Sequence, residues 1–209
     1  MTEQITEVSG LTGNQLKLIA AAAMLLDHIG VIFFPKVLWL RLVGRLAYPI
    51  FAFMIAQGCR YTKNKIRYFV TMAGLAAGCQ VVYYLFDKSL YMCILVTFSL
   101  SVLMIYALQF MKRSLSSEAF PLWKKCIGVI LFPALVLTVF LLNQHVRIDY
   151  GFWGSMVPVF VALFHPVQEG TKNGIKRNKV QLSCSPRVQV YALGAGLLIM
   201  ALSFSGTAQ

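Results

Sequence analysis

Apolar residues gather in long blocks along this chain, with short polar stretches between them. We expect seven of these blocks to be helices: 16–34, 38–57, 66–86, 91–111, 126–142, 152–164 and 188–204. Most approach the roughly twenty residues that a helix needs to cross the hydrocarbon of a bilayer. The block at 152–164 is the shortest and contains Pro158, so we expect it to be kinked or only partly inserted. The pattern therefore predicts an all-α, polytopic transmembrane helical bundle of about seven helices, with residues 1–209 as a single integral membrane domain.

Basic residues lie in the stretches between the blocks. The chain has 19 Lys and Arg against 7 Asp and Glu, which gives a formal charge of +12. The basic loops follow the second, fourth and sixth blocks: Arg60, Lys63, Lys65 and Arg67; Lys112, Arg113, Lys124 and Lys125; Lys172, Lys176, Arg177, Lys179 and Arg187. Loops rich in Lys and Arg stay in the cytoplasm, so we predict a multi-pass protein of the cell membrane with a cytoplasmic N-terminus. Because cytoplasmic loops of a membrane protein explain the positive charge, no nucleic-acid partner is expected.

Three other features narrow the class. Residues 1–10 carry Glu3 and Glu7 and no basic cluster, so no cleavable secretory signal is expected and the first block should remain as a helix. The five cysteines are isolated and lack the paired spacing of a metal site, so we expect free thiols and no metal. The polar stretch 168–185 is predicted to be a linker.

Two ionisable residues, Asp27 and His28, lie inside the first block. An ionised Asp near the middle of a membrane helix costs about 2.5 to 3.5 kcal/mol, so it needs a partner or a purpose. Histidine exchanges a proton near neutral pH, which suits a general base. The alternative is an Asp27 that only pairs with a basic residue to hold two helices together. The other histidines, His145 and His165, lie near block ends and are expected to be solvated or interfacial.

Arg41 and Arg45 supply basic partners for this pair, because they are four residues apart on one face of the second block. An antiparallel hairpin around Pro35 would bring Arg45 to the depth of Asp27. Arg41 would then lie nearer the surface, where an arginine can also extend to lipid headgroups.

Two more polar clusters lie at block ends. Arg147, Asp149 and Tyr150 fall between the fifth and sixth blocks and either line a polar vestibule or form a simple loop ion pair. The basic group at the end of the second block contains Arg60, Tyr61, Lys63, Lys65 and Arg67. It either fixes topology and contacts anionic lipid, or binds a cofactor rich in phosphate.

Four stretches together resemble a known family. They are Leu-Asp-His-Ile-Gly at 26–30, Arg-Leu-Val-Gly-Arg-Leu-Ala-Tyr-Pro-Ile-Phe-Ala-Phe at 41–53, Thr-Phe-Ser-Leu-Ser at 97–101 and Asp-Tyr-Gly at 149–151. In this order the chain resembles the TraX-like membrane proteins, which include pilin N-acetylases and are related to the transmembrane acyltransferases. Gln57 stands where family members often have an acidic residue, and Cys93 stands near a usual asparagine. The resemblance also leads us to expect a further apolar segment after Gln209.

The resemblance implies a membrane enzyme that transfers acetyl from cytoplasmic acetyl-CoA to an acceptor amine or hydroxyl outside. The acceptor is a peptide N-terminus or a glycan or lipid hydroxyl, and a homo-oligomer is compatible with this function. By analogy, the catalytic residue is His28, assisted by Asp27 and Arg45. The acyl-CoA is expected to contact Arg60, Lys63, Lys65 and Arg41. The acceptor is expected to contact Asp149 and Tyr150.

Two functions of other classes remain open at this stage. In a small proton-coupled transporter, Asp27 and His28 would relay protons with Arg45 as a counter-ion, and substrate flux would not depend on CoA. In a membrane scaffold, the buried charges would only fix helix packing, so replacing Asp27 and Arg45 together by apolar residues would preserve function.

Overall fold

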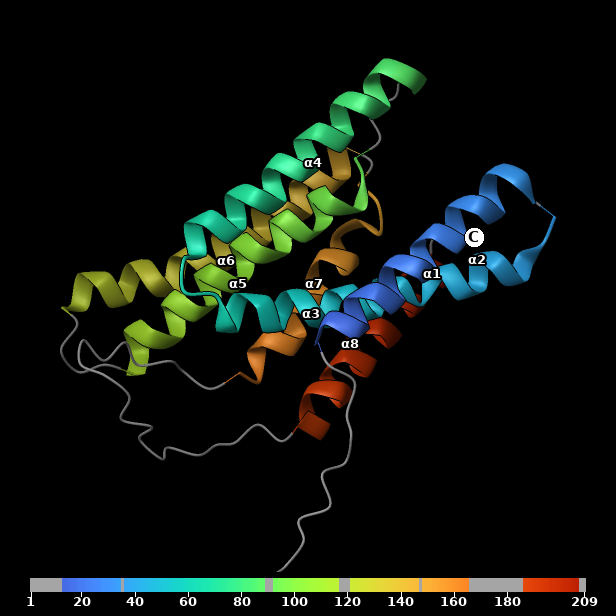
Figure 1. Ribbon diagram of the computed structural model, residues 1–209. Helices are drawn as coiled ribbons and strands as arrows, with labels where there is room; N and C mark the ends of the chain where they lie inside the picture. The colour runs from blue at the N-terminus through green and yellow to red at the C-terminus, as the bar shows by residue number, and fades with distance from the viewer. Residues whose placement is uncertain are drawn as a thin grey trace, which may run out of the picture. The chain divides into compact units, whose positions relative to one another are not determined.

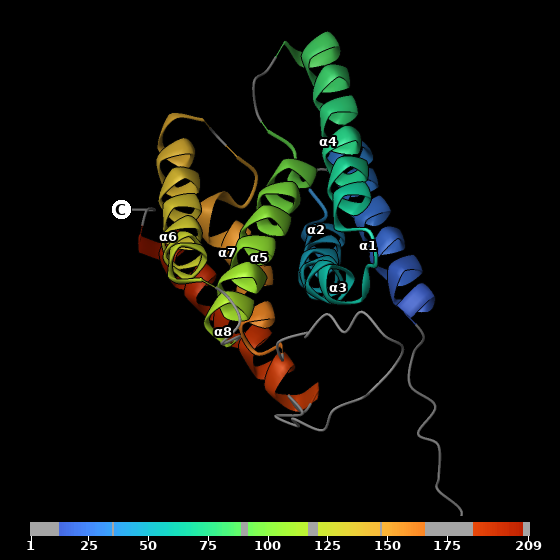
Figure 2. The same cartoon turned by 90° about the vertical axis from the view of Figure 1, so that its left-hand side faces the viewer.

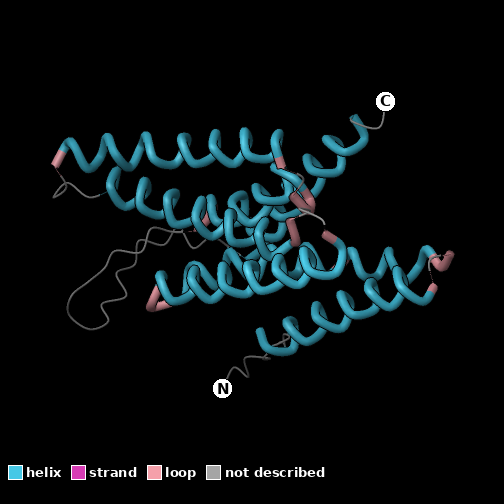
Figure 3. Tube along the Cα trace, turned by 90° about the horizontal axis from the view of Figure 1, so that it is seen from above, coloured by secondary structure: helices cyan, strands magenta, loops and turns pink. Residues whose placement is uncertain are grey.

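The computed structural model is helical in nearly all of the residues that it describes, which are 13–34, 36–88, 92–116, 121–146, 148–165 and 186–206 (Figure 1). The helices are α1 (Gly13–Phe33), α2 (Leu38–Arg45), α3 (Ala47–Tyr61), α4 (Lys65–Asp87), α5 (Ile94–Ser116), α6 (Leu122–His145), α7 (Gly151–Leu163) and α8 (Pro186–Gly206). Figure 3 shows these ranges as helices joined by short loops. The β-type pairing within them is limited to one isolated bridge, Met92 with Ile148. The predicted all-α class is confirmed.

Each predicted block is a helix, but the second block forms two. The helical hydrogen-bond pattern is interrupted at Leu46, between α2 and α3, although Leu46 keeps helical φ and ψ of −67° and −19° and lies within the apolar helical segment Leu42–Tyr61. Pro49 explains the break, because it has no N–H to donate to the carbonyl of Arg45 and its ring crowds that carbonyl. Arg45 is therefore the last residue of α2 and lies near the start of the apolar segment Leu42–Tyr61.

Four helical segments in the described part of the chain are long and apolar enough to cross a membrane. They are Leu42–Tyr61, Lys65–Leu85, Ile94–Ser116 and Leu122–His145, and Gly151–Leu163 and Val188–Ser203 are shorter apolar helices. The shortest predicted block corresponds to α7, whose 13 residues span about 20 Å, less than the bilayer's hydrocarbon core of about 30 Å. The membrane location is supported, while the number of crossings and the cytoplasmic N-terminus stay predictions.

The chain forms two compact units, which are described separately here. Unit 1 ends at Met54, and in it α1 packs along α2 as a hairpin (Figure 1). Unit 2 begins at Ile55 and is built around α5, which packs against α4, α6 and α7. Figure 2 shows α5 between α4 and α6. The interpretation of residues 1–209 as a single domain stays a prediction.

The core of unit 2 lies where α5 meets α7. The fully buried side chains of α5 include Phe98, Val102, Met104, Ile105 and Leu108. Helix α7 is buried from Gly154 to Val159 and again at Val161 and Ala162. A short helix that is apolar on all sides is typical of a position inside the protein, and α7 packs on α8 as well as on α5. This arrangement fixes the two ends of α7, where polar residues lie.

Candidate functional site

The predicted catalytic histidine lies on an exposed face of α1, within unit 1. His28 Nδ1 is 2.8 Å from the carbonyl oxygen of Met24. Because a carbonyl can only accept, Nδ1 must carry the proton and donate it. In the neutral ring, the lone pair is then on the other nitrogen, Nε2, and a neutral ring of this kind can act as a base.

Asp27 faces α2 and contacts Gly44. A Cβ placed on Gly44 would lie 2.2 Å from Asp27 Cβ and 2.7 Å from its Oδ1, so only glycine fits here. Gly44 precedes Arg45, so the hairpin has the expected register, with Arg45 at the level of Asp27. Neighbouring helical residues point about 100° apart, and Asp27 and His28 therefore face different directions.

The structure gives less about Arg45 and Arg41, the two arginines that were predicted to pair with Asp27. The side chain of Arg45 is exposed, and no ion pair joins it to Asp27 in the described residues. Arg41 belongs to α2, but its side chain is not described. Arg147 lies outside the described residues. The pairing of Asp27 with an arginine stays a prediction.

Asp149 and Tyr150 form the turn that precedes α7 in unit 2. The Thr97 hydroxyl donates to the Asp149 carbonyl at 2.6 Å, and the Asp149 N–H donates to the Met92 carbonyl at 3.0 Å. Tyr150 and Gly151 both have φ of 59°, in the left-handed region. One turn along α5, the Ser101 hydroxyl is 2.8 Å from the Ser155 carbonyl. Within the Thr-Phe-Ser-Leu-Ser stretch, Thr97 therefore holds the Asp-Tyr-Gly turn and Ser101 holds the first turn of α7.

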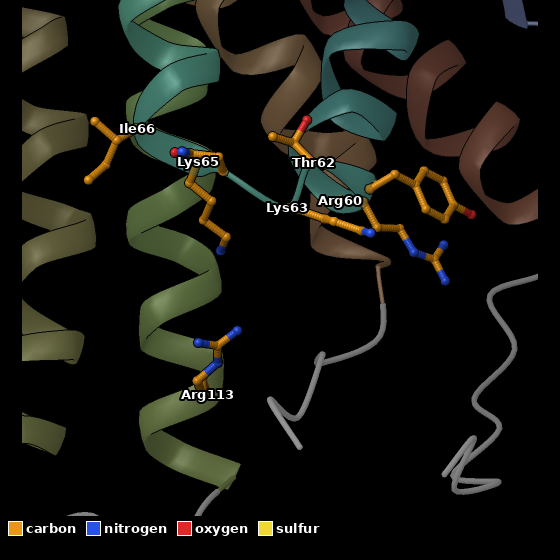
Figure 4. A pocket seen from close by; sticks show the side chains of 8 residues that line it. Arg60, Thr62, Lys63, Lys65, Ile66 and Arg113 are labelled. Atoms are coloured by element: carbon orange, nitrogen blue, oxygen red, sulfur yellow. The ribbon is translucent and has the colours of Figure 1, made fainter. Parts of the chain in front are cut away.

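A basic pocket opens at the turn between α3 and α4. Its volume is about 730 Å³, and it is lined by Arg60, Tyr61, Thr62, Lys63, Asn64, Lys65, Ile66 and Arg113 (Figure 4). Four of these residues are cations and none is acidic. Asn64 caps α4 by accepting the Arg67 N–H at 3.0 Å, so the pocket also lies at the N-terminus of α4, where anions are favoured. We call this cavity the basic pocket.

The cations of the basic pocket differ in how they are held. Lys65 donates to the Gln109 side-chain oxygen at 2.5 Å and lies 5.1 Å from the centre of the Tyr106 ring, so it joins α4 to α5. Arg60 lies over the Tyr61 ring at 5.3 Å, and Lys63 is exposed. Figure 4 shows Lys65 and Arg113 reaching into the same space from different helices.

Arg113 is the pocket residue that the sequence did not indicate. It belongs to the basic loop after the fourth block, 48 positions from Lys65, and only the packing of α4 on α5 brings the two together. Its Nε atom is buried and has no hydrogen-bond partner among the described residues. A buried donor left in this state is normally satisfied by water or a ligand.

A comparison with protein families decides the family. The TraX protein family model matches residues 12–204, nearly the whole chain. The chain belongs to the TraX family. The match includes the hairpin of α1 and α2, the turn before α7 and the basic pocket, so all the candidate residues lie within it. It ends within α8. That helix is joined to α3 by a hydrogen bond that the Gln57 side chain donates to the Gln189 side chain at 2.5 Å.

Curated relatives match the TraX-family chain over shorter stretches. A probable fimbrial assembly protein, FimC of serogroup H1, from Dichelobacter nodosus is 40% identical over 58 residues, which is 26% of this chain and 24% of that protein. An uncharacterised protein from Rickettsia prowazekii is 40% identical over 52 residues, which is 25% of this chain and 21% of that protein. The matches thus span less than a quarter of these relatives' own lengths. No solved structure matches the chain significantly.

Proposed function

We propose that this TraX-family protein is a membrane-embedded acyltransferase that binds acetyl-CoA in the basic pocket and passes the acetyl group to an acceptor outside. The observation that carries the proposal is the meeting of Arg60, Lys63, Lys65 and Arg113 around one cavity. None of the described residues that line the cavity is acidic. An anionic ligand with several phosphates would neutralise the four cations.

The size and chemistry of the basic pocket suit a nucleotide. Its volume of about 730 Å³ is in the usual range of small-molecule sites, about 300 to 1,000 Å³. Arginine binds phosphate through two parallel hydrogen bonds, and the pocket has two arginines on different helices. The N–H groups at the start of α4 add further donors. Lys65, although it also bonds Gln109, has two more ammonium protons to donate.

The tautomer of His28 suits the transfer step. Nε2 would take the proton from the acceptor amine or hydroxyl as its nitrogen or oxygen attacks the acetyl carbonyl. The new bond joins the acceptor to the carbonyl carbon, the carbon–sulfur bond breaks, and the thiolate of CoA takes the proton back from His28. Arg45 would stabilise the oxyanion, and Asp27 is expected to support this pair. An acetyl-histidine intermediate is an alternative route to the same products.

A pilus-related acceptor is the most specific one that we propose. Its support is the name of the Dichelobacter nodosus relative, a fimbrial assembly protein, and the resemblance to pilin N-acetylases. We therefore propose the N-terminal amine of a pilin-type peptide as acceptor, with contacts to Asp149 and Tyr150. The rigid turn that carries these two residues suits a binding surface, because Thr97 and Met92 fix its backbone.

Binding of CoA tests the pocket. The protein in nanodiscs of neutral lipid would be titrated with CoA, first unchanged and then as Arg60→Gln and Arg113→Gln. Each lost charge-assisted hydrogen bond is worth about 1.5 to 3 kcal/mol, so we expect each variant to bind roughly ten- to a hundredfold more weakly. Arg67→Gln is the matched control, because Arg67 is an exposed arginine on α4 that does not line the pocket. Failure of the unchanged protein to bind CoA would overturn the proposal.

Two further arms separate the parts of the proposal. Nanodiscs with anionic lipid show whether headgroups compete for the pocket: binding to lipid alone, with no displacement by CoA, assigns the pocket to lipid. His28→Ala should abolish acetyl transfer to a pilin peptide and leave the affinity for CoA unchanged. Full turnover in His28→Ala would remove His28 from the mechanism.

A further inference from the structure

One side of α5 carries three residues that meet the start of α4: Tyr106, Gln109 and Arg113. Gln109 and Arg113 are three and seven residues after Tyr106, which places all three on the same side of the helix. Arg113 lines the basic pocket together with Lys65, the first residue of α4. Tyr106 and Gln109 contact Lys65 but do not belong to the lining of the pocket. They can therefore act on a ligand only through the residues that they contact.

Gln109 makes two hydrogen bonds that fix the direction of its amide. Its Oε1 accepts from the Lys65 ammonium at 2.5 Å, and its Nε2 donates to the Cys59 carbonyl at 3.3 Å. An ammonium group only donates and a carbonyl only accepts, so the opposite orientation of the amide would lose both bonds. Cys59 lies in the last turn of α3 and Lys65 at the start of α4. One neutral side chain on α5 is thus bonded to both sides of the α3–α4 turn.

The neighbours of Lys65 hold a flexible cation in one place and leave it charged. A lysine side chain has much rotamer freedom, which a bound ligand would otherwise have to remove. Here the ammonium group is bonded to the Gln109 oxygen and lies 5.1 Å from the centre of the Tyr106 ring. Both neighbours are uncharged, so the positive charge of Lys65 is not neutralised. Gln109 uses one of the three ammonium protons, so protons remain for a ligand.

This position of Lys65 is costly without an anion. Figure 4 shows the side chains of Lys65 and Arg113 pointing toward each other across the basic pocket. Two positive charges that face each other repel, and a free lysine side chain would turn away. Arg113 also has a buried Nε with no hydrogen-bond partner among the described residues. An anion between the two cations would remove the repulsion and accept from both side chains.

We propose that Gln109 is a positioning residue of the basic pocket, which holds the Lys65 ammonium opposite Arg113 so that a phosphate group of the ligand binds between the two cations. The proposal deepens the proposed function and rests on it for the class of ligand, a phosphate ester. Gln109 does not touch the ligand and acts through Lys65. Because Lys65 is already fixed, binding does not have to order it, and the gain is about two- to tenfold in affinity.

A double-mutant cycle tests whether Gln109 acts through Lys65. The full-length protein in nanodiscs of neutral lipid would be titrated with CoA, unchanged and as Gln109→Met, Lys65→Met and the double variant. Gln109→Met keeps an unbranched side chain and removes the amide. We expect it to bind CoA about two- to tenfold more weakly, and Lys65→Met about ten- to a hundredfold more weakly. With Lys65 already replaced, Gln109→Met should change the affinity by less than about twofold, because no ammonium group is left to position.

A purely structural role of Gln109 predicts a different result. If its bond to the Cys59 carbonyl only holds α3 against α5, Gln109→Met weakens binding by the same factor with and without Lys65, and the proposal is overturned. Lys63→Gln is the matched background, because Lys63 lines the pocket but is not bonded to Gln109. Gln109→Met should keep its full effect there. Gln144→Met changes an exposed glutamine in the last turn of α6 and should leave the affinity for CoA unchanged.

A second variant keeps the test decisive if Gln109→Met does not fold, which helical circular dichroism would reveal. Gln109→Asn keeps an amide but is one methylene shorter, so the amide is drawn back from Lys65. The same cycle applies to it. A loss of affinity that disappears in the Lys65→Met background supports the positioning role, and an equal loss in both backgrounds overturns it.

Titration with pyrophosphate separates this proposal from the proposed function. Binding of CoA with additive losses overturns the role of Gln109 and keeps the proposed function. Binding of pyrophosphate that depends on Gln109 only through Lys65, without any binding of CoA, keeps the role of Gln109 and overturns the proposed function. If neither ligand binds, both are wrong.

Discussion

The contact between Gly44 and Asp27 makes the sharpest prediction about unit 1. In Gly44→Ala, the new Cβ would lie 2.2 Å from Asp27 Cβ, whereas carbon atoms in contact normally lie about 3.5 to 4.0 Å apart. The shortfall is roughly 1.3 to 1.8 Å. Asp27 Cβ is bonded to the backbone and cannot rotate away, so α1 and α2 must separate.

The size of the effect follows from two opposing terms. Overpacking costs about 1 to 3 kcal/mol, and a contact this short belongs at the upper end. Alanine gains up to about 1 kcal/mol over glycine in helix propensity. We therefore expect Gly44→Ala to lower the free energy of unfolding by about 2 kcal/mol. Acetyl transfer should fall as well, because Asp27 is displaced.

Reversible unfolding in mixed micelles, followed by the loss of helical circular dichroism, measures this difference. Gly74→Ala on α4 is the matched control, since a Cβ there meets nothing within 4 Å. That variant should be as stable as the unchanged protein or up to about 1 kcal/mol more stable. If Gly44→Ala unfolds at the same denaturant concentration as Gly74→Ala, the close packing of α1 on α2 at Asp27 is refuted.

Three further predictions concern the two ends of α7. Lys112→Met removes an ammonium group from three carbonyls and should lower the free energy of unfolding by about 2 kcal/mol in the same assay. Stability should fall as the pH drops from 6.5 toward 4: burial lowers the pKa of His165 to about 4 in the folded state, so the unfolded chain binds more protons, and His165→Gln should flatten this slope. Gly151→Ala forces a side chain onto a φ of 59° and should cost about 1 to 2 kcal/mol, while Gly78→Ala should cost nothing.

The helices could be predicted from the sequence because the apolar blocks are long and their ends are polar. The apolar block at 38–57 was predicted and corresponds to the segment Leu42–Tyr61, but the interruption of its helical hydrogen bonds at Leu46 was not, although Pro49 stands three residues later in the printed sequence. A long apolar run hides such a break, since hydropathy does not change across it. As a result, the sequence did not indicate that Arg45 is the last residue of α2, where its side chain is exposed.

The basic pocket could be predicted only in part. Three of its cations lie within six residues of each other, so sequence alone gathers Arg60, Lys63 and Lys65. Arg113 joins them through the packing of α4 on α5, which no local pattern specifies. The prediction that His165 is solvated or interfacial is wrong, because only 6% of its surface is exposed. The reason is similar: a position near the end of an apolar block says nothing about which neighbouring helices cover it.

The preference for basic residues on one side of a membrane explains why arginines and lysines occur at this end of unit 2, but it does not explain where they point. A topological signal works equally well when each cation extends into solvent, as exposed Lys63 and Arg67 do. Arg113 instead has its Nε buried, with no hydrogen-bond partner among the residues that the structure describes, and it lies beside Lys65, where like charges repel. Lipid headgroups could relieve that repulsion, because the pocket opens widely to the surface. A pocket of about 730 Å³ that gathers arginines from two helices can equally take one ligand with several phosphates, and the competition between CoA and anionic lipid decides between them.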